Sequence, residues 1–151
     1  MRTPLLSAVL VAAMSVGLAA PSAHAASGTT ASDVGGFVTD GDHVHVSSTP
    51  PATASAHGWW MDPLGKHKNV KAKVTVWLQT KHGNTWRTVA EGSKKVKAGG
   101  KGASSRRANA RRTCENRDKT QWRSVIDVDL IGIADSPEKA VTRAVTLACG
   151  A

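Results

Sequence analysis

Apolar and polar residues alternate along two long stretches of this chain. Every second residue is apolar from 70 to 78, and again from 122 to 130 with Ser124 as an exception. Side chains point alternately to the two faces of a strand, so each stretch predicts a strand with one buried and one wet face. Val74, Val76, Ile126 and Val128 are expected to be buried.

Shorter alternating segments predict further strands. Residues 82–84 predict a turn that joins 70–79 to a partner strand over 85–90. Loops are predicted at 48–58 and 98–105, where Pro, Gly and small residues are concentrated. Ser136 and Pro137 form a helix-start signal, and we expect at most one helical turn there. The other predicted strands are 42–47, 106–114 and a last one that leads to Cys149.

Six or seven short strands without a long helical pattern predict an all-β fold. We expect a small antiparallel β-sandwich of immunoglobulin-like architecture, or a small barrel, as a single domain over 37–151. The likeness to immunoglobulin domains is architectural only, because the chain has no Tyr and therefore no tyrosine corner.

The first 25 residues have the features of a secretory signal peptide. An apolar run follows Arg2, and Ala23 and Ala25 form an Ala-x-Ala cleavage site. Residues 26–36 are small and polar and predict a flexible lead-in. The run is short for a membrane span and no later stretch approaches the roughly 20 apolar residues that one needs. We therefore expect a secreted, extracellular protein that does not span a membrane.

Cys114 and Cys149 are the only two cysteines in the chain. In an oxidising compartment an even pair in a small domain predicts one disulfide. That bond would exclude both sulfurs as nucleophiles or metal ligands.

The chain is strongly basic, with 20 Lys and Arg against 11 Asp and Glu and a formal charge of +9. Much of this charge lies between residues 94 and 123, and cations that converge bind phosphates. We expect an anion-binding surface for cell-wall polyphosphate or nucleic acid, with a merely solvated basic face as the alternative. The residues predicted to form it are Arg106, Arg107, Arg111 and Arg112.

Two histidines in the predicted first strand offer a metal site as another possibility. His43 and His45 would leave one face of the strand, and paired imidazoles suit Zn²⁺ or Cu²⁺. Asp42 lies beside them and could take part. The alternative is a solvated strand face. A third ligand would have to come from a predicted loop histidine, namely His57, His67 or His82.

Trp59 and Trp60 stand next to each other in a predicted loop. If one ring is exposed, it could stack on a sugar as in carbohydrate-binding modules. The alternative is that the pair caps one end of the core.

No sequence motif of the common hydrolases, metalloproteases or phosphate-binding enzymes is present. The alanine-rich signal and the stretch 122–129 resemble uncharacterised small exported β proteins of actinobacteria, a resemblance that implies no catalytic motif. We therefore expect a non-enzymatic exported module without a cofactor, which binds anionic cell-envelope polymers or, alternatively, a metal or a carbohydrate.

Overall fold

The computed structural model describes residues 36–47, 49–135, 137 and 139–149. The predicted signal peptide, 1–25, and residues 26–35 of the predicted lead-in lie outside the described residues. In the part of the chain that is described, no helix is both long and apolar enough to cross a membrane.

The first of two antiparallel sheets is built around one central strand, β3 (Thr53–Met61). β6 (Ala108–Thr113) pairs with one edge of β3. β1 (Val38–Gly41) and β2 (His45–Ser47) follow each other along the other edge. The chain between β1 and β2 therefore interrupts this edge beside the middle of β3.

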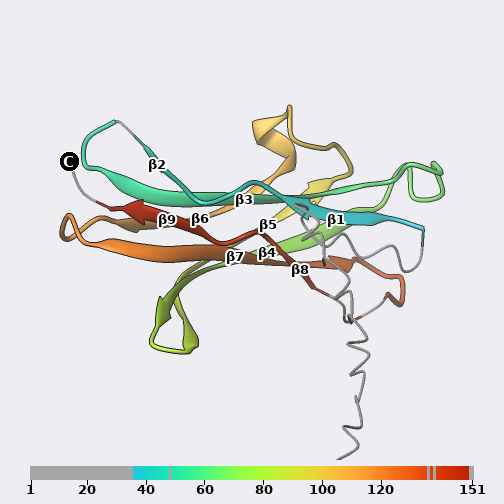
Figure 1. Cartoon of the computed structure of the whole chain (residues 1–151). Coiled ribbons are helices and arrows are strands. Elements are labelled where there is room, and N and C mark those ends of the chain that lie inside the picture. The colour runs from blue at the N-terminus through green and yellow to red at the C-terminus, as the bar shows by residue number, and fades with distance from the viewer. Residues whose placement is uncertain (1–35, 48, 136, 138, 150–151) are drawn as a thin grey trace, which may run out of the picture.

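The second sheet contains the long strands. β4 (Lys71–His82) lies between β5 (Thr85–Lys97) and β7 (Lys119–Leu130). Two short strands, β8 (Ala140–Val141) and β9 (Val145–Ala148), pair with β7. Figure 1 shows the two sheets stacked as layers, with the connection between β5 and β6 rising above β3. This arrangement is a sandwich and not a closed barrel.

The core between the sheets combines small and large side chains. β4 and β7 contribute the larger aliphatic residues, among them Val76, Leu78 and Ile126. β3 and β6 contribute mainly alanines on the facing side, and Trp60 closes one end with Phe37 packed edge-on against it. The buried faces predicted for β4 and β7 are confirmed.

The predicted disulfide between Cys114 and Cys149 is confirmed. Cys114 follows β6 of the first sheet and Cys149 follows β9 of the second, with their Cα atoms 4.9 Å apart. The bond therefore joins the two sheets at one end of the sandwich.

Two sequence predictions about local structure are wrong. The segment 48–58 is a loop only as far as Ala52, because β3 begins at Thr53 and is the centre of its sheet. The predicted strand 42–47 is broken, and only its second half forms β2. In both cases the pairing or interruption of strands decided the outcome, and neither is encoded in local propensity. At the predicted helix start Ser136 lies outside the described residues and Pro137 is in no helix, which agrees with the expectation of at most one turn.

Candidate metal centre

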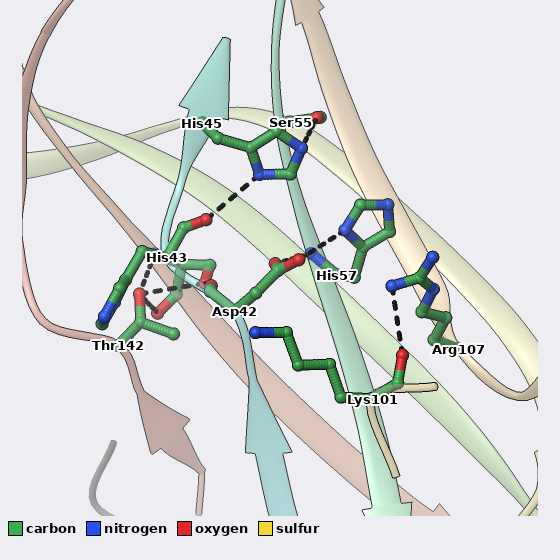
Figure 2. A network of polar contacts seen from close by, with 9 residues as sticks. Asp42, His43, His45, Ser55, His57, Lys101, Arg107 and Thr142 are labelled. Carbon is green, nitrogen blue, oxygen red and sulfur yellow. Dashed lines mark hydrogen bonds and ion pairs between the residues drawn. The ribbon is translucent and has the colours of Figure 1, made fainter. Parts of the chain in front are cut away.

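Three potential metal ligands meet on the outer face of the first sheet. Asp42, His45 and His57 each offer one ligand atom, and these atoms lie within 4.8 Å of one another. They come from the break between β1 and β2, from β2 itself and from β3 (Figure 2). Three segments that are separate in sequence thus place two imidazoles and one carboxylate around a common point.

Strand register explains why the two histidines share a face. His45 of β2 pairs with Ser55 of β3, and His57 is two residues further along β3. Residues two apart in a strand point to the same side, so Ser55 and His57 both face outward with His45. The two imidazole rings stack, with centroids 5.5 Å apart and an angle of 21° between the planes.

The carboxylate of Asp42 is held in two places by His57. Its Oδ1 accepts a hydrogen bond from the backbone N of His57 at 2.5 Å, and its Oδ2 lies 2.7 Å from Nδ1 of the ring. The backbone N of Asp42 donates to the His57 carbonyl at 3.1 Å. Because the chain leaves the sheet edge here, the Asp42 side chain can turn over β3 and is oriented before any ion binds.

The hydrogen bonds of His45 fix its orientation and its tautomer. Nδ1 lies 3.3 Å from the His43 carbonyl, and Nε2 lies 3.1 Å from Ser55 Oγ. A carbonyl only accepts, so Nδ1 is the donor and Nε2 of the neutral ring accepts from the Ser55 hydroxyl. A metal ion would replace one of these two partners. The side chain is exposed, so that exchange requires no rearrangement of the core.

The floor beneath the cluster is closely packed. Gly41 of β1 pairs with Gly58 of β3, next to Asp42 and His57 in the chain. A Cβ atom on Gly58 would lie 2.7 Å from Ile126 Cγ2 and 2.8 Å from Val76 Cγ2. The two sheets therefore approach closely under the cluster. This close approach leaves no room for a side chain at Gly58, the residue after His57.

His43, one of the two histidines predicted to form a pair, does not join the cluster. Figure 2 shows its imidazole on the Thr142 side, away from His57. The predicted pairing of His43 with His45 fails because the strand is broken at residues 42–44, which cancels the alternation on which it rested. His57 was placed in a loop but belongs to β3. The alternation of small residues between 53 and 58 was the signal that could have shown this.

His67 and His82, the other two histidines in the described part of the chain, also have other partners. His67 is paired with Asp62, whose carboxylate accepts hydrogen bonds from the backbone N of Lys66 at 3.0 Å and of His67 at 2.6 Å. Burial raises the pKa of this carboxyl, but these hydrogen bonds outweigh it and hold the pKa below its ordinary value. His82 Nε2 lies 3.1 Å from Thr80 Oγ1 at the β4–β5 turn.

Trp59 and Trp60 do not form an exposed pair in a loop, so this sequence expectation is corrected. Both belong to β3, and their exposed fractions are 3% and 0%. Trp60 points into the core and its Nε1 donates to the Val96 carbonyl at 3.2 Å. The β5–β6 connection meets β3 beside this residue, where Gly99 N donates to the Trp60 carbonyl at 2.9 Å. Neither ring presents a face on which a sugar could stack.

The four predicted anion-binding arginines do not converge. Arg106 donates to the Ala98 carbonyl, and Arg112 pairs with Glu115 and lines a cavity beside the disulfide. Arg107 and Arg111 instead line cavities that also contain His57. Arg111 and Arg112 are neighbours in β6 and therefore point to opposite faces. The basic segment is divided between two sides of the molecule.

No family model matches this chain, and no curated protein matches it significantly. Its function is therefore inferred from the geometry of the site alone.

Proposed function

We propose that this protein binds a divalent transition-metal ion, Zn²⁺ or Cu²⁺, through Asp42, His45 and His57. The observation that carries the proposal is the convergence of these three ligand atoms within 4.8 Å. Two imidazoles and one carboxylate are a donor set that suits both ions. The role is binding and not catalysis, in keeping with the lack of enzyme motifs in the sequence.

The ligands need only small side-chain movements to close around an ion. Zinc–nitrogen and zinc–oxygen bonds of about 2.1 Å at tetrahedral angles separate neighbouring ligand atoms by about 3.4 Å. The Asp42–His57 contact of 2.7 Å is shorter than this, and all three ligand atoms lie within 4.8 Å of one another. Loss of the proton on His57 Nδ1 and rotation of the exposed His45 ring would bring all three into range.

The protein is proposed to work outside the cell. The predicted signal peptide supports export, and the disulfide fits an oxidising compartment. A site of two imidazoles and one carboxylate on an exported domain would meet free metal ions directly at the cell surface or in the medium.

Calorimetric titration of tag-free protein with ZnCl₂ and with CuCl₂ tests the proposal. The parent should bind one equivalent, and His45→Ala should weaken binding at least about tenfold, because a lost ligand costs no less than a lost outer-shell partner. His43→Ala is the matched control, since this neighbouring exposed histidine lies outside the cluster. Its affinity should equal that of the parent.

Unfolding provides a second measurement. A metal ion at 100 times its Kd should raise the free energy of unfolding by about 2.7 kcal/mol, because it binds only the folded protein. The proposal is wrong if the parent takes up neither ion, or if His45→Ala binds as tightly as His43→Ala.

A further inference from the structure

The metal cluster opens into a cleft with basic walls. One cavity of about 420 Å³ is lined by both cluster histidines together with Ser55, Asn109 and Arg111. A second, smaller cavity shares His57 and Asn109 with it. Asp42 contacts His57 Nδ1 and lines neither cavity. Because both cluster histidines line the larger cavity, an ion that they hold would border the cleft.

Cations line both cavities. Arg111 lies in one cross-strand row with Ser55 and His45, as the pairing of β6, β3 and β2 shows. Arg107 and Lys94 line the second cavity beside His57. Figure 2 shows the Arg107 guanidinium on the His57 side, where its Nη1 donates to the Lys101 carbonyl at 3.3 Å.

Two of these cations have no partner among the residues that the structure describes. The side chains of Arg111 and Lys94 take part in no hydrogen bond or ion pair there, unlike those of Arg106 and Arg112. The residues that line the two cavities include no carboxylate. Positive charge in this cleft is therefore uncompensated, and an ion on the cluster would add to it. Three cations and a divalent ion would face the single carboxylate of Asp42.

We infer that the cleft binds a phosphate group, either free phosphate or a phosphate monoester, bridged between the cluster-bound metal ion and the pair Arg111 and Lys94. This inference rests on the proposed metal binding. A dianion with several acceptor oxygens matches this charge, and it can ligate the ion while guanidinium and ammonium groups donate to its other oxygens. The Asn109 amide and the Ser55 hydroxyl add neutral donors along the same walls.

Titration of inorganic phosphate and of phenyl phosphate into protein loaded with one equivalent of Cu²⁺ tests this inference. Heat measures binding, and the copper EPR spectrum reports both ligation of the ion and its retention by the protein. Arg111→Gln and Lys94→Gln should each weaken phosphate binding about tenfold, the usual loss for one charged hydrogen bond, and leave copper affinity nearly unchanged. Arg87→Gln is the matched control, because this exposed arginine lines neither cavity.

The outcomes separate this inference from the proposed function. Copper binding with a phosphate-dependent change of the EPR spectrum, lost in Arg111→Gln but kept in Arg87→Gln, supports both. Copper binding without that change, or with equal phosphate affinity in all variants, overturns the inference and leaves the metal site standing. Failure of the parent to bind copper overturns the metal site, and with it the bridged phosphate. Binding of phenyl phosphate as tight as that of free phosphate would identify a monoester as a ligand.

Discussion

Adding one methyl group at Gly58 should destabilise the whole domain. In Gly58→Ala the new Cβ would meet Ile126 Cγ2 at 2.7 Å and Val76 Cγ2 at 2.8 Å. Favourable carbon–carbon contacts lie at about 3.5–4.0 Å, so both neighbours must move by several tenths of an ångström. Both side chains are fully buried in the middle of β4 and β7, where there is no free space to receive them.

Overpacking of this kind costs about 1–3 kcal/mol. Truncation of the opposing residue, in Ile126→Ala, should cost about 2–5 kcal/mol because it leaves a cavity. The two changes are complementary, since the methyl group at position 58 enters the space that Ile126 vacates. The double variant should therefore be more stable than the sum of the single effects implies, by about 1 kcal/mol or more.

Guanidinium unfolding followed by tryptophan fluorescence measures all four free energies. Gly102→Ala is the matched control, because a Cβ there would have no neighbour within 4 Å. Its stability should stay within about 1 kcal/mol of the parent. The close approach of the two sheets is refuted if Gly58→Ala is as stable as Gly102→Ala, or if the double variant shows purely additive losses.

Two further predictions concern the disulfide and the turn at Asp62. Replacing both cysteines, in Cys114→Ser with Cys149→Ser, should lower the free energy of unfolding by about 3–4 kcal/mol, because the bond closes 35 residues of sequence and restricts the unfolded chain; equal denaturation midpoints for the parent and the variant would contradict it. Since hydrogen bonds lower the pKa of Asp62, its carboxylate contributes stability above about pH 4 that is lost as the pH falls through the lowered pKa. The stability cost of Asp62→Asn should therefore be larger at pH 6 than near pH 2.5 in urea unfolding, and a cost independent of pH would show that the carboxylate charge is not what stabilises this turn.

The sequence by itself determined the long strands β4 and β7, the turn between β4 and β5, and the disulfide. In β4 and β7 large aliphatic residues alternate with polar ones, and that contrast is strong enough to predict the strands and their buried faces. The β4–β5 hairpin was predicted from its turn, where Gly83 has a positive φ of 58°. The disulfide was predicted because the chain has only two cysteines. Each of these features follows from a local sequence pattern or from the only possible cysteine pairing.

The first sheet was decided by tertiary contact. Its central strand, β3, carries Thr, Ala, Ser, His and Gly, a composition that by itself is typical of a loop. These residues are small because Val76 and Ile126 of the other sheet fill the space against them. The hydrophobic pattern of β3 is therefore weak because the other sheet packs so closely against its inward face. Trp59 and Trp60 were misplaced with it.

The candidate metal centre also depends on tertiary contacts between distant segments. His45 was recognised from its own strand, but its partner in the cluster is His57, twelve residues away in a segment predicted to be a loop. Only the pairing of β2 with β3 brings the two rings together, and only the break after Gly41 turns Asp42 toward them. Alternation within one strand predicts which side chains share a face. Which strands become neighbours depends on how closely two sheets can pack, and that is a property of residues distant in sequence.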